Sequence, residues 1–252
     1  MKLNVPIYLR RGKKKGNQAK HLASATWLIN LLCQVQGVEN LSEIELLDMG
    51  CGTKLVQAIL DNQIPIGRYV GVDIYKEMID FLSAEVDDPR FSFYHMNFHN
   101  EMYNPEGEPL DGAKGLPFSN YDQFDLICLF SVFTHLAPHD FNEMLKLLRP
   151  HIKPQGKLVF SLFVNEVTEE GHGLIDGIAK HLKKKGQGSP ENESKERNPP
   201  PPFLDLNPKK PLEYAVYARE YALELMEGTG WNIDSLNDPE KHIQHYMICS
   251  PA

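Results

Sequence analysis

Short apolar segments that alternate with helix-like stretches constrain the fold of this chain most. The apolar segments lie at 44–50, 69–74, 91–97, 124–130 and 157–163. Between several of them the sequence has the periodicity of amphipathic helices, at 54–62, 75–86 and 138–149. Strands that alternate with helices in this way form a sheet with helices on both faces. The sequence therefore predicts an α/β fold with a doubly wound, mostly parallel sheet.

The residues before the first apolar segment form a separate predicted unit, 1–40. Its first twenty residues are polar and basic, and leucines at helical spacing predict a helix over 22–35. We expect the basic arm to be either solvated or part of a lid that contacts an acidic substrate.

The alternation of strands and helices is interrupted at the segment 167–211, which is rich in lysine, glycine and proline. Such a composition does not support a packed core, so we expect an irregular, lid-like insertion. The pattern then resumes with a helix over 217–229 and strands over 231–236 and 242–248. We therefore expect one domain over 41–252 that carries this insertion.

Composition and charge narrow the class of protein. The 252 residues include 26 Lys and Arg against 34 Asp and Glu, a net charge of −8, so broad binding to nucleic acid is not expected. No run approaches ~18 consecutive apolar residues, and no signal peptide is recognisable, so we expect no contact with the membrane. The four scattered cysteines favour a reducing cytoplasm over a disulfide framework. The oligomeric state cannot be predicted.

The first candidate ligand-binding motif lies where the first predicted strand ends in a glycine turn, Leu47-Asp-Met-Gly-Cys-Gly-Thr-Lys54. Glycines let the backbone approach a ligand closely, and the N–H groups of the following helix face that ligand. A dinucleotide site requires a third glycine, and Leu55 stands at that position. The turn is therefore a weak match to an oxidoreductase.

Asp48-Met-Gly50-Cys-Gly52-Thr resembles motif I of class I S-adenosylmethionine-dependent methyltransferases. The residue that ends the second predicted strand is Asp73, whose carboxylate can accept hydrogen bonds from both ribose hydroxyls of a cofactor. The alternative is that Asp73 caps the helix that begins near Tyr75.

The resemblance extends to the later strands, and the segments Met102–Gly107 and Phe163–Glu166 are similar to those of a bacterial subgroup that acts on small molecules. Phe124-Asp-Leu-Ile followed by Ser131-Val-Phe-Thr-His135 is similar to the fourth strand and its exit loop, and 147–158 is similar to the turn before the fifth strand. The resemblance implies a Rossmann-like, seven-stranded sheet with a reversed C-terminal hairpin. It also implies that S-adenosyl-L-methionine is the cofactor.

Two residues depart from the family pattern. Lys54 stands where a third glycine is usual, and it either points to solvent or crowds the methionine end of the cofactor. Asn97 stands where an Asp usually ends the third strand, and it retains hydrogen-bonding capacity toward the adenine edge without a charge. The resemblance implies that the glycine turn holds the methionine end. The candidate cofactor-binding residues are Asp48, Gly50, Cys51, Gly52, Asp73, Ile74, Met78, Asn97, Phe98, Phe130 and Ser131.

Two histidines are candidate catalytic residues. His135 follows the fourth predicted strand at its carboxyl end, where ligands bind in open α/β sheets, and a base assists methyl transfer to a hydroxyl. The alternative is a packed or capping histidine. His139, near the start of the next helix, is either a second candidate or a surface residue. His95 and His99 lack partner carboxylates at ligand spacing, so we expect no metal site.

These observations predict a methyltransferase that acts on a small molecule, at a hydroxyl of a natural product or sugar. The basic arm leaves an RNA methyltransferase as an alternative, which would bind RNA with a steep salt dependence. A further alternative is a non-catalytic, methyltransferase-like partner protein, if Lys54 blocks the cofactor.

Overall fold

The computed structural model describes most of the chain. The described residues are 2–10, 16–110, 115–118, 122–165, 177–178, 182–184, 201–207, 209–237 and 244–252.

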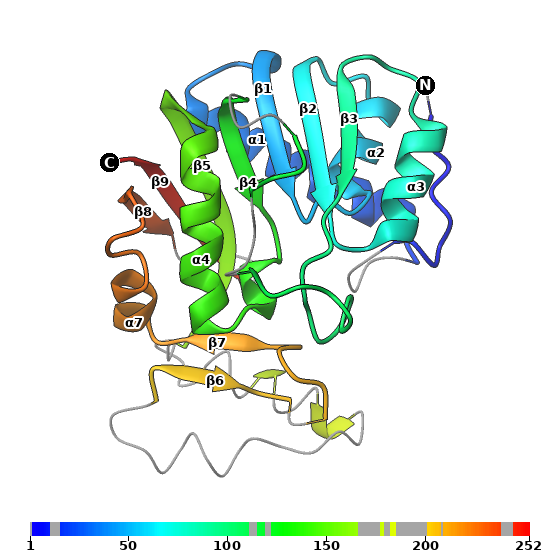
Figure 1. Cartoon of the computed structure of the whole chain (residues 1–252). Helices are drawn as coiled ribbons and strands as arrows, with labels where there is room; N and C mark the ends of the chain where they lie inside the picture. The colour runs from blue at the N-terminus through cyan, green and yellow to red at the C-terminus, as the bar shows by residue number, and fades with distance from the viewer. Residues whose placement is uncertain are drawn as a thin grey trace.

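A mostly parallel sheet forms the centre of the molecule (Figure 1). Its strands run in the order β3-β2-β1-β4-β5, and β9 then pairs antiparallel with β5 and with β8. The predicted seven-stranded α/β sheet with a reversed C-terminal hairpin is therefore confirmed. The strands are β1 (Leu41–Met49), β2 (Ile66–Asp73), β3 (Phe91–His95), β4 (Phe124–Leu129), β5 (Ile152–Val164), β8 (Trp231–Asn237) and β9 (His245–Pro251).

Helices cover both faces of the sheet, with one hydrophobic cluster on each face. One cluster joins the sheet to α1 (Gln18–Gln36), α2 (Lys54–Asp61) and α3 (Lys76–Glu85). The other joins it to α4 (Pro138–Leu148) and α7 (Arg219–Glu224). Short 3-10 helices, η2 and η3, occupy Phe133–His135 and Arg149–His151. The parallel strands are thus buried from both sides, as their apolar sequences predict.

The N-terminal segment is more closely packed than a solvated arm. Leu3, Val5 and Leu9 are buried in the cluster that contains α2. The Leu3 N–H donates to Asp61 Oδ1 (2.8 Å), and Gln57 Nε2 donates to the Leu3 carbonyl (3.0 Å). The expectation of a solvated arm is therefore wrong for residues 2–10, because apolar residues between the polar ones find a place in the core. Residues 11–15 of the basic arm lie outside the described residues.

Helix α1 begins earlier than the leucine pattern predicts. Asn17 accepts a hydrogen bond from the Lys20 N–H (3.0 Å) and caps the helix, which begins at Gln18, four residues before position 22. At the other end Gly37 adopts a left-handed conformation (φ 73°), which ends the helix.

A small hairpin forms beside the end of β5. Strands β6 (Phe203–Asp205) and β7 (Ala215–Tyr217) are antiparallel, and β7 runs parallel to the last residues of β5. Part of the segment 167–211, which was expected to be irregular, is therefore a strand (β6). The helix expected over 217–229 is shorter and corresponds to α7. Most of the predicted insertion lies outside the described residues, so its role as a lid stays a prediction.

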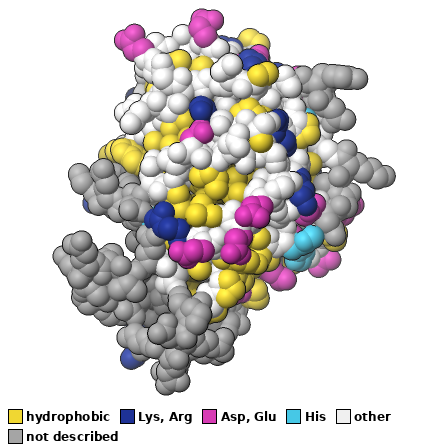
Figure 2. Space-filling view, turned by 90° about the vertical axis from the view of Figure 1, so that its left-hand side faces the viewer, with side chains coloured by type: hydrophobic (Ala, Val, Ile, Leu, Met, Phe, Trp, Pro, Cys, Tyr) yellow, Lys and Arg dark blue, Asp and Glu magenta, His cyan; other side chains and the backbone are white. Residues whose placement is uncertain are grey.

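The edge of the sheet formed by β8 and β9 presents a mixed surface. Figure 2 shows hydrophobic side chains in the middle of this face with acidic and basic side chains around them. Ile233 of β8 is one of the exposed large hydrophobic residues (37%). In the described part of the chain, no helix has the length and apolar character needed to cross a membrane.

Candidate active site

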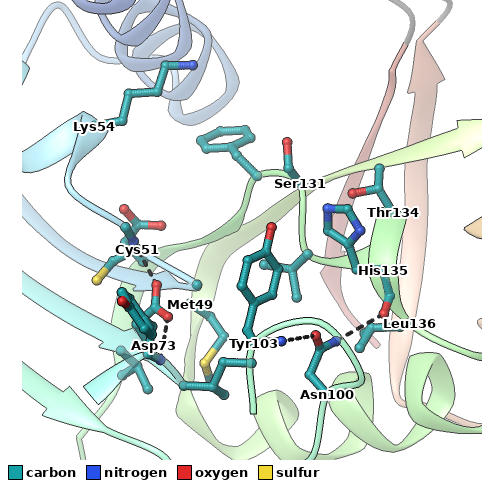
Figure 3. Close-up of a pocket in the computed structure, with 18 of the residues that line it drawn as sticks. Met49, Cys51, Lys54, Asp73, Asn100, Tyr103, Ser131, Thr134, His135 and Leu136 are labelled. Carbon is teal, nitrogen blue, oxygen red and sulfur yellow. Dashed lines mark hydrogen bonds between the residues drawn. The ribbon is translucent and has the colours of Figure 1, made fainter. Parts of the chain in front are cut away.

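A cavity of about 600 Å³ opens at the carboxyl ends of β1, β2 and β4. Its size lies within the about 300–1,000 Å³ typical of small-molecule sites. Residues of α1, the segment 96–110, η2 and the segment before β7 complete its walls. Figure 3 shows part of this lining, with Asp73, Tyr103, Ser131 and His135 among the labelled side chains. This is the end of the sheet at which open α/β folds bind ligands.

The glycine turn after β1 forms one wall. The N–H groups of Gly50 and Cys51 donate to the Val72 carbonyl (2.7 and 3.0 Å), which ties the turn to β2. Gly50 has φ 74°, and a Cβ at this position would lie 2.4 Å from Val132 Cγ2. Gly52 is also left-handed (φ 51°). The turn therefore requires glycine at Gly50 for both its backbone conformation and its close packing.

Asp73 is held at the end of β2 by two backbone hydrogen bonds. Its Oδ2 accepts from the Gly52 N–H and its Oδ1 from the Tyr75 N–H, both at 2.9 Å. The N-cap of α3 is Tyr75, so Asp73 is not the capping residue of that helix. The carboxylate instead joins the glycine turn to β2 and lines the cavity (Figure 3).

Asp48 lies at the buried base of the same wall, with 2% of its surface exposed. Its carboxylate accepts from the Tyr69 hydroxyl (2.5 Å) and from Cys128 Sγ (3.4 Å). Burial raises the pKa of Asp48 to about 6. Burial also raises the pKa of the Cys51 and Cys128 thiols well above the usual range, so neither is an activated nucleophile.

Ser131 follows β4 in a strained left-handed conformation (φ 62°). Its N–H donates to Ser161 Oγ (2.8 Å), and Gln244 Nε2 donates to its hydroxyl (3.0 Å). These contacts hold the loop that carries Phe130 and Ser131 against the cavity.

The structure brings most of the predicted site residues together. Those that line the cavity are Asp48, Gly50, Cys51, Gly52, Asp73, Ile74, Met78, Phe98, Phe130, Ser131 and His135.

Asn97 and His139 are not among the lining residues. Asn97 is exposed, and its Oδ1 accepts from Asn104 Nδ2 (3.0 Å). Side chains alternate along an extended backbone, so Met96 and Phe98 line the cavity while Asn97 does not. His139 is exposed. We therefore remove both from the candidate site.

His135 belongs to η2 and lines the cavity, as do His21 and His99. Its Nδ1 lies 3.0 Å from the Leu212 carbonyl oxygen. A carbonyl accepts only, so Nδ1 carries the proton in this pair and the neutral ring has its lone pair on Nε2. Burial lowers the pKa of His135, which favours the neutral form. Asn100 Nδ2 donates to the His135 carbonyl (3.3 Å), and the Tyr103 ring meets the imidazole edge-on.

Several lining residues were not predicted from the sequence. Thr134 Oγ1 is buried without a hydrogen-bond partner among the described residues. His21, Ser24, Trp27 and Leu28 line the cavity from α1. Their helical spacing predicts a packed face, and nothing in it indicates a ligand. Among the described residues, no group of three or more His, Cys, Asp or Glu side chains is placed to hold a metal ion.

The strand order, the reversed hairpin, the glycine turn and the acid at the end of β2 define a class I methyltransferase fold. The comparison with protein families agrees, since the model described as a methyltransferase domain matches residues 25–236. The chain belongs to this family, and the resemblance inferred from the sequence is confirmed.

Individual relatives are distant. The chain is 27% identical over 143 residues to malonyl-[acyl-carrier protein] O-methyltransferase of Priestia megaterium (strain DSM 319 / IMG 1521). This match covers 57% of the chain and 44% of the relative, so the chain matches less than half of that protein.

Two solved structures show the same fold. The PH0226 protein of Pyrococcus horikoshii OT3 has a TM-score of 0.58 at 16% identity, over 99% of this chain and 100% of that one. Magnesium protoporphyrin IX methyltransferase from Synechocystis PCC 6803, with bound S-adenosylhomocysteine, has a TM-score of 0.53 at 12% identity, over 96% and 89%.

The predicted cofactor, S-adenosylmethionine, is confirmed. The cavity of this chain fits it, because its volume of about 600 Å³ suits a small molecule and the Asp73 carboxylate is fixed at the cavity wall beside the glycine turn.

Proposed function

We propose that this protein transfers a methyl group from S-adenosylmethionine to a hydroxyl oxygen of a small molecule, with His135 as the general base. The observation that carries the proposal is the contact between His135 Nδ1 and the Leu212 carbonyl, which leaves Nε2 as the basic nitrogen of a cavity-lining ring. When bound, the cofactor supplies the electrophilic methyl group.

The proposed cofactor contacts follow from the geometry of the first two strands. Asp73 accepts hydrogen bonds from the ribose hydroxyls, and the Gly50–Gly52 turn lies against the methionine end. Ile74, Met78 and Phe98 supply apolar surface. These residues would hold the cofactor beside the part of the cavity that His135 lines.

His135 serves as the base because its neutral form is favoured near neutral pH. In the proposed step, Nε2 would take the proton of the acceptor hydroxyl as its oxygen receives the methyl group that the cofactor would supply, which would leave S-adenosylhomocysteine. The Leu212 carbonyl then faces the protonated ring and stabilises its positive charge. Glu213 also lines the cavity, and its charge favours the same protonated form.

The wall near His135 supports an acceptor that is mostly apolar and carries a hydroxyl. Thr134 Oγ1, which has no partner among the described residues, offers a hydrogen bond to a second polar group. A hydroxylated natural product fits these features better than a free sugar, because a sugar has little apolar surface. The apolar residues that line the cavity here include Met102, Leu110, Leu136, Met144 and Phe163.

A pair of histidine variants tests this proposal. The purified protein is incubated with S-adenosylmethionine and a panel of hydroxylated natural products and sugars, and the release of S-adenosylhomocysteine identifies the acceptor. His135→Asn should then lower kcat by roughly 100-fold or more, since a general base contributes about 10²–10⁴. The matched control is His139→Asn, an exposed site four residues away, which should stay within about twofold. Full turnover by His135→Asn contradicts the proposed base.

A further inference from the structure

His21 of α1 is a buried polar side chain that lines the cavity. It is 3% exposed and lines the cavity, and its Nε2 has no hydrogen-bond partner among the described residues. A buried polar atom in this state is unfavourable unless a ligand supplies the missing hydrogen bond. The position of His21 therefore indicates contact with a polar group of a bound molecule.

Lys54 lines the same cavity as His21, and helices α1 and α2, which carry these two residues, pack against each other. It is the first residue of α2, immediately after the glycine turn, and it lines the cavity with His21. Figure 3 shows its side chain extended from the turn toward the side on which Ser131 lies. Burial lowers the pKa of His21, and the positive charges of Lys54 and Arg10 lower it further.

The chemistry of this part of the cavity is that of an anion site. The N-terminus of a helix carries a partial positive charge. A lysine at the first position of the helix adds to it, so the helix end and the lysine together raise the local positive potential. The carboxylates that line the cavity come from other elements: Asp48 and Asp73 from the ends of β1 and β2, Asp140 from α4 and Glu213 from the segment before β7. An anionic group of the ligand is therefore favoured beside α1 and α2.

We infer that His21 and Lys54 form a subsite that binds the carboxylate at the methionine end of the cofactor. Lys54 follows the glycine turn directly, whereas Asp73 marks the ribose end of the site, so the order of groups along the wall matches the order along S-adenosylmethionine. The lysine that departs from the family pattern is then a binding residue. The inference rests on the cofactor and is independent of the acceptor and of His135.

Calorimetric titration with two ligands tests this subsite. S-adenosylmethionine is compared with decarboxylated S-adenosylmethionine, which keeps the sulfonium and the amine and lacks only the carboxylate. Lys54→Met should weaken binding of S-adenosylmethionine about tenfold, as expected for a hydrogen bond to a charged group. The same variant should bind the decarboxylated ligand as well as the wild type or better, because a repulsion between two cations is removed.

Three further variants complete the design. His21→Leu should also weaken S-adenosylmethionine more than the decarboxylated ligand, and Lys54→Arg should keep most of the affinity. Lys20→Met is the matched control, since Lys20 is an exposed lysine of α1 beside His21 and is not a lining residue. Circular dichroism and thermal melting check that each variant is folded.

The outcomes separate the possibilities. A loss confined to the ligand with the carboxylate supports the subsite. An equal loss for both ligands, no change for either, or tighter binding of S-adenosylmethionine by Lys54→Met overturns it, the last because it would mean that the lysine crowds the cofactor.

Discussion

Nδ1 of His135 lies 3.0 Å from the carbonyl oxygen of Leu212, a residue 77 positions later in the chain. Leu212 is held in a left-handed conformation (φ 57°), and its N–H donates to Asp205 Oδ2 (2.8 Å). The partner of the proposed base therefore comes from the connection between β6 and β7, and Asp205 fixes the peptide that positions the ring.

Asp205→Ala tests this relationship. Without the carboxylate, the left-handed Leu212 loses a hydrogen bond and its carbonyl no longer has a fixed position. Turnover should fall roughly tenfold, because small displacements of a catalytic group are costly, while the affinity for S-adenosylmethionine stays unchanged. Steady-state kinetics and calorimetry measure the two effects. Asp80→Ala, at an exposed ion pair with Lys76, is the control. An equal loss of cofactor affinity in Asp205→Ala would mean that Asp205 acts on the whole site and not on His135.

Asp73→Asn should remove most of the affinity for the cofactor. An amide cannot accept at both positions, so one of its atoms would face the N–H of Gly52 or Tyr75 as a donor. Because two charge-assisted hydrogen bonds to ribose hydroxyls are lost, the affinity for S-adenosylmethionine should decrease about 100-fold or more. Calorimetry measures this affinity. Asp80→Asn, at the exposed site on α3, should bind like the wild type. Micromolar binding by Asp73→Asn would exclude the ribose role.

Gly50→Ala should destabilise the protein much more than Gly37→Ala. The two glycines have nearly the same φ (74° and 73°), but a Cβ at Gly50 would lie 2.4 Å from Val132 Cγ2, whereas at Gly37 nothing lies within 4 Å. Gly37→Ala then reports backbone strain alone, about 1–2 kcal/mol. Gly50→Ala adds overpacking, for a total of roughly 3 kcal/mol or more.

Urea unfolding measures both variants. Combining Gly50→Ala with Val132→Ala should recover part of the loss, because the truncated side chain no longer meets the new Cβ. Similar losses in the two single variants would show that the packing at Gly50 does not matter.

Asp48→Asn should stabilise the folded protein above pH 6. Asp48 ionises near pH 3.8 in the unfolded chain, whereas burial raises its pKa to about 6 in the folded chain. Between these values the folded state binds the proton more tightly, so the free energy of unfolding decreases as the pH rises through this window. The asparagine avoids this cost and still accepts from the Tyr69 hydroxyl.

The expected gain for Asp48→Asn is up to about 3 kcal/mol at pH 7.5, with little gain at pH 4. Urea unfolding at the two pH values measures it, with Asp80→Asn as the exposed control. A gain that does not depend on pH would show that the buried charge is not its source.

The order of elements could be predicted from the sequence because it depends on local patterns. The apolar segments and the strand–glycine–helix pattern at Gly50 predict the parallel strands and the turn. Boundaries were less predictable, since the cap at Asn17 lies outside the apolar pattern of α1. The strands β6 and β7 are short and depend on pairing with the end of β5, so no local pattern indicates them.

The candidate site could be predicted only in part. The glycine turn and Asp73 act at the ends of adjacent strands, so their positions follow from the order of the elements. Asn97 was assigned by analogy of position, and the alternation of side chains after β3 places it outside the cavity. His21 has no local signal at all, because a histidine on a packed helix face is usually part of a core.

The sequence by itself was enough to identify the family and the glycine turn. Left-handed glycines, helical periodicity and apolar strands all depend on residues that are close together in the chain. Only the tertiary structure placed His135 at the cavity and His139 outside it, gave His135 its partner Leu212 and brought His21 and Lys54 into the wall of one cavity. These relationships join residues far apart in the chain. They depend on how helices and strands pack, which determines burial, hydrogen-bond partners and local charge.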